Sequence, residues 1–365
     1  MKKRKKAMRA IGMLLMLSMA MTGCSSSNQE ETATSPAISY NEIPGGTYVE
    51  QNFEPDSNLF PSEDNSGMDL AGLQGINGEI YFYAEKIGKK SDEEGMHVIP
   101  EEIALVKYEG EKAVKVDCPW AKAVKKFRDK NKLDLMRVYM GQDGKLYQEL
   151  AELKDDAIEK EYLLQIDLQT NQWKEIPLPK LPKNDNGKGV TWVNTDVFAD
   201  GNVLIQNGST INGIYNPLDG RCIRELENPA VLKMAGNGEY FSFDVDMTTG
   251  LPTKIVSYSE KSGEKGHEIS LAALEERDAS NPSEYVRYFQ DSFYYITRGG
   301  IYRADIDEDS FTRIVSKNDR VLKLGSNNYM VSNLLVDGIN EGFYVTYYEN
   351  HGTYDRKMCY YKKQE

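Results

Sequence analysis

The chain has 365 residues and a formal net charge of −13, from 57 acidic and 44 basic side chains. This acidity disfavours a nucleic-acid-binding protein, which presents a basic face to phosphate, and a mean hydropathy of −0.58 excludes a polytopic membrane protein. With 40% hydrophobic residues the chain can bury a sizeable core, and 23 Tyr against 11 Phe favour β-strands.

The first 24 residues have the layout of a secretory signal. Six basic residues precede Ala10–Thr22, an apolar run too short to span a bilayer. The segment ends in Met21-Thr22-Gly23-Cys24, which resembles a lipobox, where small residues precede an acylated Cys. We predict a signal peptide over residues 1–23, lipidation of Cys24 (palmitate), and a position on the outer, extracytoplasmic face of the cell membrane. The alternative is an ordinary secreted protein with a chance Cys.

The remaining residues divide into a tether and one domain. Residues 24–43 are polar and lack apolar periodicity, so they cannot form a core and we expect a flexible tether. Residues 44–365 are expected to form the domain. Its cysteines, Cys118, Cys222 and Cys359, are an odd number without CxxC spacing, so at least one is free or paired with another chain. We expect all three to be small buried or half-buried residues.

The domain reads as short strands in repeated groups. From Gly45 onward, runs of Tyr, Val, Ile and Phe alternate with Gly, Asn and Asp turns, which is typical of strands. The clearest unit spans Tyr285–Val315, four strands joined by hairpins, and its Ile-Tyr-x-x-Asp hairpin recurs along the chain. A turn closes the first strand of each unit at Gly78, Gly144, Gly201, Gly238, Asp291 and Gly338. About six units, with five to seven allowed, predict an all-β fold: a single β-propeller of four-stranded blades.

Other segments qualify this pattern. The last unit has three strands and ends at Arg356–Tyr361, and Gly46–Phe53 is expected to supply the fourth strand and close the ring. Pro119–Phe127 predicts a short helix with Pro in its first turn. Residues 146–160 fit either a helix or a long hairpin, and Leu271–Arg277 is expected to form a helical turn.

No catalytic or cofactor-binding motif occurs in the sequence: GxSxG, HExxH, P-loop and GxGxxG are absent. Of the three histidines, His97 is expected in an acidic loop over Lys89–Glu102 and His351 in a hairpin turn, and a catalytic role for them or His267 is disfavoured. Asp305–Asp309 has the spacing of a calcium loop without its Gly and Glu, so we expect a solvated turn between the third and fourth strands of a blade. We expect no enzyme, no metal and no cofactor.

Aromatic side chains could stack on sugar rings, or they could fill the spaces between blades. We favour the second interpretation, since aromatics at alternate strand positions point between blades. The candidates are Trp120, Trp173, Trp192 and the Tyr pairs at 294–295, 347–348 and 360–361.

Together, the lipobox-like end, the tether and the Ile-Tyr-x-x-Asp hairpins resemble surface lipoproteins of Gram-positive, clostridia-like bacteria that carry a β-propeller. In some of these, the propeller precedes an extracellular solute-binding domain of an ABC importer, and Gly46–Glu50 looks like the start of such propellers. The resemblance implies a lipid-anchored module that binds an unknown protein or glycan ligand beside a nutrient-import or envelope complex. We expect a monomer and, from the acidic charge, no nucleic-acid partner. Cys24 is the only functional residue that it carries over.

Two alternatives remain open. A carbohydrate-active enzyme, a glycosidase or lyase on the same fold, would need two acids converging on the central channel with Tyr or Trp beside them. A substrate-binding lipoprotein with two α/β lobes would need recurring helices of ten or more residues, which the sequence does not show.

Overall fold

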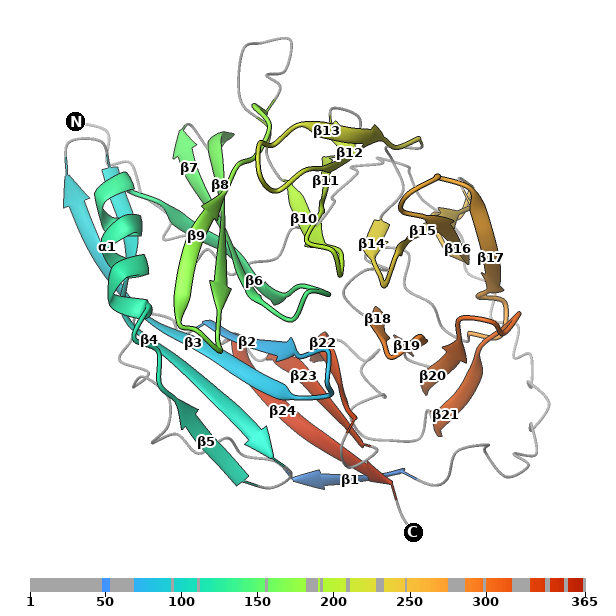
Figure 1. Cartoon of the computed structure of the whole chain (residues 1–365). Coiled ribbons are helices and arrows are strands. Elements are labelled where there is room, and N and C mark those ends of the chain that lie inside the picture. The colour runs from blue at the N-terminus through green and yellow to red at the C-terminus, as the bar shows by residue number, and fades with distance from the viewer. Residues whose placement is uncertain are drawn as a thin grey trace, which may run out of the picture.

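The computed structural model describes residues 48–52 and 69–363, except 93–94, 110–111, 155–156, 182–189, 191–192, 208–210, 228–232, 247, 275–285, 298–299, 317–328, 339–341 and 351–353. The described residues form six four-stranded antiparallel sheets and one helix. Viewed as in Figure 1, the sheets are arranged around a common centre, with the first strand of each sheet innermost. The chain is therefore a six-bladed β-propeller, which confirms the predicted fold class.

The first half of the chain forms three blades. Blade 1 consists of β2 (Asp69–Gln74), β3 (Ile80–Asp92), β4 (Gly95–Glu109) and β5 (Lys112–Val116). Helix α1 (Ala121–Asn131) then leads to blade 2, made of β6 (Asp134–Met140), β7 (Leu146–Lys154), β8 (Ala157–Asp167) and β9 (Gln172–Ile176). Blade 3 consists of β10 (Asn194–Val197), β11 (Val203–Asn207), β12 (Ile211–Tyr215) and β13 (Cys222–Glu225).

The second half forms the other three blades. Blade 4 consists of β14 (Lys233–Ala235), β15 (Glu239–Val245), β16 (Pro252–Ser259) and β17 (Lys265–Ser270). Blade 5 consists of β18 (Val286–Phe289), β19 (Ser292–Thr297), β20 (Gly300–Asp305) and β21 (Thr312–Ser316). Blade 6 consists of β22 (Tyr329–Asp337), β23 (Gly342–Asn350), β24 (Tyr354–Lys363) and β1 (Tyr48–Asn52).

Strand β1 closes the ring, as the sequence predicts. It pairs antiparallel with β24, from Tyr48 opposite Lys363 to Asn52 opposite Cys359. Blade 6 therefore combines three strands from the C-terminal end with one from the N-terminal part of the chain (Figure 1). This pairing gives β24 a partner along the edge that would otherwise be the free outer edge of the blade.

Apolar side chains fill the spaces between blades. Six clusters of buried residues occur, one between each pair of neighbouring blades. Because side chains alternate along a strand, one strand serves two clusters: in β23, Phe343 and Val345 pack against blade 5, whereas Tyr344 packs against blade 1. Most described tyrosines are buried in this way. They are Tyr81, Tyr83, Tyr108, Tyr139, Tyr147, Tyr162, Tyr215, Tyr240, Tyr288, Tyr295, Tyr302, Tyr344, Tyr360 and Tyr361.

Glutamine side chains connect blades to the inner strand of a neighbouring blade. Gln74 in blade 1 accepts a hydrogen bond from the backbone N–H of Val336 in blade 6 (2.6 Å) and donates one to its carbonyl (2.7 Å). Gln206 in blade 3 makes the same pair of bonds with Lys233 in blade 4, at 3.0 and 2.7 Å. The inner strand lies at the edge of its sheet, where its outward backbone groups lack a strand partner, and these amides supply one.

Several local expectations are confirmed or corrected. The predicted helix is α1, but Pro119 precedes its N-cap residue, Trp120, instead of lying in the first turn. Residues 146–160 lie within the hairpin β7–β8, whose apolar residues pack on both faces of the blade. The prediction of a loop over Lys89–Glu102 is wrong, because β3 and β4 continue through this segment as paired strands.

In the described part of the chain, α1 lacks the length and apolarity that a membrane-spanning helix needs.

Candidate functional site

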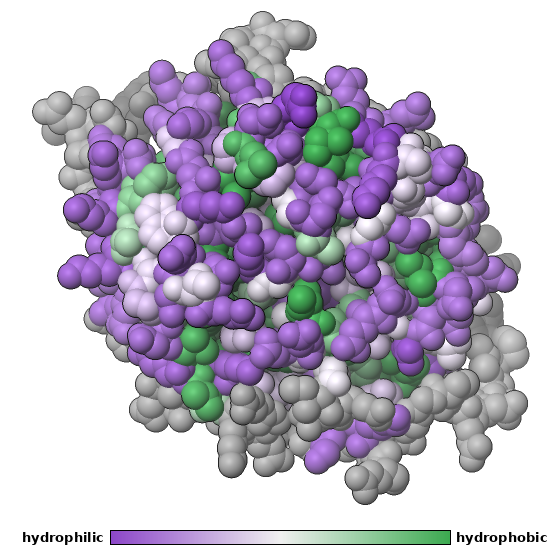
Figure 2. All heavy atoms as spheres, viewed as in Figure 1, coloured by the Kyte–Doolittle hydropathy of each residue, from purple (hydrophilic) through white to green (hydrophobic). Residues whose placement is uncertain are grey.

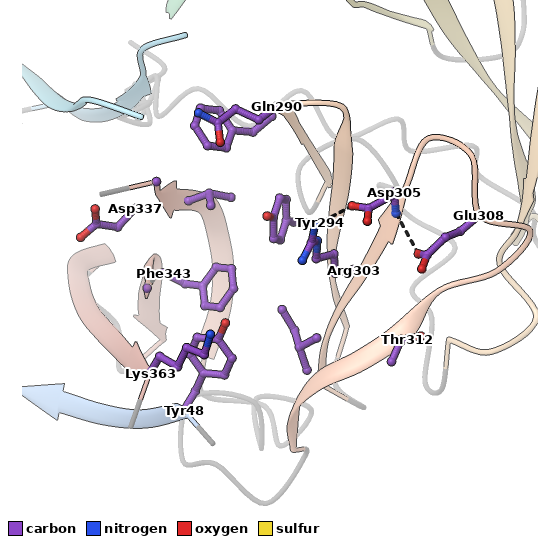
Figure 3. A pocket seen from close by; sticks show the side chains of 15 residues that line it. Tyr48, Gln290, Tyr294, Arg303, Asp305, Glu308, Thr312, Asp337, Phe343 and Lys363 are labelled. Atoms are coloured by element: carbon purple, nitrogen blue, oxygen red, sulfur yellow. Dashed lines mark hydrogen bonds and ion pairs between the residues drawn. The ribbon is translucent and has the colours of Figure 1, made fainter. Parts of the chain in front are cut away.

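A pocket of about 390 Å³ lies between blades 5 and 6 (Figure 3). Its volume is within the range of about 300–1,000 Å³ that is typical of ligand sites. One wall comes from strands β18 to β21 of blade 5 and the turns between them, and the other from β22, β23, β24 and β1 of blade 6. Tyr48 and Lys363, on the two strands that close the ring, both line it, so ring closure completes the pocket.

Three aromatic rings form a row across the pocket. The ring centroid of Phe343 lies 4.9 Å from that of Tyr48 and 5.7 Å from that of Tyr294. Phe343 is buried, and the two tyrosines are half-buried, so the tyrosines present partly open ring surface. Figure 3 shows the three rings following one another across the pocket.

Charged groups lie beside this aromatic row, on blade 5. Arg303 Nη2 is 2.6 Å from Asp305 Oδ1, and the side chains are 47% and 42% exposed. Ser292 Oγ donates a hydrogen bond to the same Asp305 oxygen at 2.5 Å, and the Asp305 backbone N–H donates one to Glu308 Oε2 at 2.9 Å (Figure 3). The guanidinium and carboxylate are therefore held in place by neighbours and still accessible to a ligand.

The electrostatic surroundings keep Arg303 charged. Burial opposes its charge, but Tyr294, Asp305 and Glu308 outweigh that effect and raise the pKa of the guanidinium. Lys363 lines the opposite wall. The pocket thus offers cationic and anionic hydrogen-bonding groups together with an aromatic surface.

A second group of charged residues lies on the inner strands, where it joins blades 2, 3 and 4. Asp196 on β10 accepts hydrogen bonds from its neighbour Val197 at Oδ1 and from Ala235 of blade 4 at Oδ2, through backbone N–H groups each 2.9 Å away. Arg137 on β6 donates from Nη1 to the Thr195 carbonyl of blade 3 at 2.9 Å. Both carboxylate oxygens of Asp196 are thus occupied by backbone.

Arg287 on β18 joins blades 5 and 6 in the same way, since its Nε donates to the Leu334 carbonyl at 2.8 Å. Burial, together with the nearby Arg137 guanidinium, lowers the pKa of Arg287 to about 10, and Asp196 opposes both effects. The charges of Arg137, Asp196 and Arg287 therefore influence one another across the inner strands. Each of these side chains also bonds the backbone of a neighbouring blade.

Two buried carboxyl groups lie between blades 2 and 3. Glu149 Oε1 accepts hydrogen bonds from Thr195, at 2.7 Å from the backbone N and 2.6 Å from Oγ1, and lies 3.5 Å from Arg137 Nη1. Glu161 is 8% exposed, and its buried Oε2 has no hydrogen-bond partner. Burial raises the pKa of both carboxyls, and the charge of Glu149 raises that of Glu161 further. Neither side chain is open to a substrate.

The raised pKa of Glu161 predicts a pH-dependent stability effect. A carboxyl whose pKa is higher in the folded state stabilises the fold below its unfolded pKa and loses that contribution as pH rises through the folded pKa. Glu161→Gln should therefore raise the free energy of unfolding at pH 8, on the order of 1 kcal/mol, because no carboxylate is then buried without a partner. Urea unfolding from pH 5 to pH 8 measures this, and a gain that does not shrink towards pH 5 would contradict it.

The residues that the sequence analysis considered for chemistry do not converge. His97 lies on β4 of blade 1 and His267 on β17 of blade 4, where its Nε2 is 2.9 Å from the Glu308 carbonyl. Cys24, His351 and Trp192 lie outside the described residues. Asp305–Asp309 forms the end of β20 and the turn to β21, as expected. Among the described residues, no group of three or more His, Cys, Asp or Glu side chains is arranged to hold a metal ion.

No disulfide joins the three cysteines of the described residues. Cys359 is buried and Cys118 half-buried, and burial raises the pKa of the Cys118 thiol to about 11. The expectation that all three are buried or half-buried is wrong for Cys222, which is exposed. Cys222 begins β13, the outermost strand of blade 3, where little of the protein covers it.

Comparisons with known proteins do not identify a family for this chain. No protein-family model matches the chain, and no curated protein is significantly similar to it in sequence. Among solved structures, it is similar to a protein of unknown function from Bacteroides caccae, with 10% sequence identity and a TM-score of 0.36 over 75% of this chain and 92% of the other.

Sequence reasoning did not find the pocket. The sequence places Tyr294 among many candidate aromatics and Asp305 in a turn. No motif or spacing marks Arg303, Phe343 or Lys363 as part of a binding site. The only available hint was the pairing of the N-terminal strand with the last strand, which brings Tyr48 next to blade 5 residues.

Proposed function

We propose that this protein is a lipid-anchored, extracytoplasmic binding module that holds a small carbohydrate in the pocket between blades 5 and 6. The observation that carries the proposal is the arrangement of three aromatic rings beside the accessible Arg303–Asp305 pair in one pocket. Ligand pockets of this kind combine an apolar surface with a few placed polar groups.

A sugar ring matches both features of the pocket. Its C–H face suits an aromatic surface, and its hydroxyl groups both donate and accept hydrogen bonds. Asp305 can accept from a hydroxyl and Arg303 can donate to one, and hydrogen bonds with charged partners are the stronger kind. Tyr48 and Tyr294, both half-buried on the pocket wall, supply the aromatic surface.

Binding without chemistry is supported better than the alternative of a glycosidase or lyase. Such an enzyme needs two accessible carboxyls at a defined separation. Near the centre of the propeller, Asp196 has both oxygens bonded to backbone and Glu149 and Glu161 are buried. In the pocket, Asp305 is already paired with Arg303 and Ser292.

Attachment to the membrane through Cys24 belongs to the same proposal, and so does a role beside a nutrient-import or envelope complex. The anchor rests on the sequence of residues 1–24 alone. Labelled palmitate should enter the wild-type protein in cells and should not enter Cys24→Ala. Equal labelling of the two proteins would refute the anchor.

Binding can be tested with the chain from residue 25, since all six sheets lie within residues 48–363. A glycan array should identify a mono- or oligosaccharide that binds, and titration calorimetry then compares variants. Arg303→Ala should weaken binding about tenfold to hundredfold, because it removes a hydrogen bond between the ligand and a charged group. Tyr294→Leu should also weaken it, through loss of aromatic surface.

Arg221→Ala is the matched control, because Arg221 is an exposed arginine on blade 3, away from the pocket. It should bind like the wild type, and a thermal melt of each variant checks that a loss of binding is not a loss of folding. An array without any binder would contradict the carbohydrate proposal. A binder whose affinity survives Arg303→Ala and Tyr294→Leu would place the site elsewhere.

A further inference from the structure

Helix α1 presents a row of lysines to solvent. Lys122, Lys126 and Lys130 are all exposed, and their spacing of four residues places them on one face of the helix. The opposite face carries Val124 and Arg128, both buried. The helix therefore separates an inward face that packs on the blades from an outward face that is strongly basic.

The row stands out in an acidic protein. Residues 112–132 contain eight basic and two acidic side chains, in a chain whose net charge is −13. Among the ion pairs of the described residues, none includes the lysines of the α1 row. Like charges four residues apart destabilise a helix. Lys130 lies in the last turn, where the helix dipole favours a cation, but helix stability does not account for Lys122 and Lys126.

The position of α1 leaves this face open. Trp120 and Val124 pack into the apolar cluster between blades 1 and 2, and α1 lies outside the sheets at the rim of the propeller in Figure 1. Over the face shown in Figure 2, hydrophilic side chains predominate and apolar ones occur in small scattered groups. An exposed row of three lysines on one helix face suits a broad anionic surface rather than a small ligand in a cavity.

We propose that the outward face of α1, formed by Lys122, Lys126 and Lys130, docks on an anionic phospholipid surface. The rest of the molecule is acidic and is repelled by such a surface, so attraction at α1 alone would fix the orientation of the propeller. Each lysine near an anionic membrane contributes about 1 kcal/mol, which gives weak binding at low salt without an anchor and is enough to orient a protein that is already tethered. This inference is independent of the pocket.

The test uses the chain from residue 25, which contains all six sheets and has no anchor. It should co-sediment at low salt with vesicles of phosphatidylglycerol and phosphatidylcholine in equal parts, but not with pure phosphatidylcholine vesicles. Binding should disappear at high salt, since the attraction is electrostatic and screened. The triple variant Lys122→Gln/Lys126→Gln/Lys130→Gln should partition roughly a hundredfold less onto the anionic vesicles.

The control is Lys180→Gln/Lys261→Gln/Lys362→Gln, which changes the net charge equally at exposed lysines elsewhere. It should bind anionic vesicles almost as well as the wild type. The proposal is overturned if the wild type ignores anionic vesicles, if it binds neutral vesicles equally, or if the two triple variants bind alike. Binding to polyglutamate without binding to vesicles would also overturn it and would indicate an acidic protein as the partner.

Discussion

Removal of residues 46–52 is expected to destabilise the whole propeller. This deletion removes β1, which pairs with β24 over five residue positions, and at roughly 1 kcal/mol per hydrogen bond the loss is on the order of 5 kcal/mol. It also removes the Tyr48 ring, whose centroid lies 4.9 Å from that of Phe343, and it exposes β24 as an unpaired edge. Thermal unfolding should show a lower midpoint, and light scattering should show aggregation.

A deletion of equal length, residues 25–31, is the control for this experiment. It shortens the expected tether and should leave the unfolding transition unchanged. If removing residues 46–52 has no more effect than this control, the ring is held closed by the apolar clusters alone and β1 is dispensable.

Arg128→Leu is expected to cost about 3–5 kcal/mol, because it leaves a buried carboxylate without its partner. Arg128 Nη1 lies 2.5 Å from Glu85 Oε1, and both side chains are almost fully buried. Glu85 also accepts a hydrogen bond from Tyr83, whose hydroxyl accepts one from Gln148 of blade 2 at 3.0 Å. The network thus joins α1, blade 1 and blade 2, and urea unfolding measures its contribution.

The double variant Arg128→Leu/Glu85→Leu provides the decisive comparison. Removing both charges avoids an unpaired buried ion, so the double variant should be more stable than Arg128→Leu. If the losses of stability in Arg128→Leu and Glu85→Leu simply add in the double variant, the two side chains do not depend on each other. The network would then not be the reason for the loss.

Much of the fold could be predicted because residues that favour tight turns recur at the same position in successive blades. Gly78, Gly144 and Gly201 have φ values of 84°, 75° and 90°, a region that favours glycine, so their recurrence marks the first hairpin of successive blades. In blade 5, Gln290 and Asp291 both have positive φ in a two-residue turn between β18 and β19. The number of strands per unit followed from such turns.

The errors arose where local signals are ambiguous. Leu146, Leu150 and Leu153 have helical spacing, yet they lie in a strand where Leu146 and Leu150 are buried in the cluster with blade 1. Burial on both faces of a blade erases the alternation that identifies a strand. Likewise, the charged run after Lys89 gave no sign that β3 and β4 extend through it.

The candidate site could not be predicted, for a geometric reason. Its walls come from two blades, and Tyr48 and Lys363 are brought together only when the ring closes. No motif links Arg303 and Phe343, because their proximity depends on how neighbouring blades pack rather than on their spacing in the sequence. The anchor at Cys24, in contrast, is predicted from local sequence alone. Cys24 lies outside the residues that the structure describes, so the anchor stays a prediction.

Hydrogen–deuterium exchange with and without a sugar identified on the array tests the central claim most directly. If the pocket between blades 5 and 6 is the binding site, the sugar should slow exchange in peptides covering Tyr294, Arg303–Glu308 and Phe343, with little change in blades 2 and 3. Protection confined to other blades, or protection that persists unchanged in Arg303→Ala, would contradict the assignment of this pocket as the ligand site.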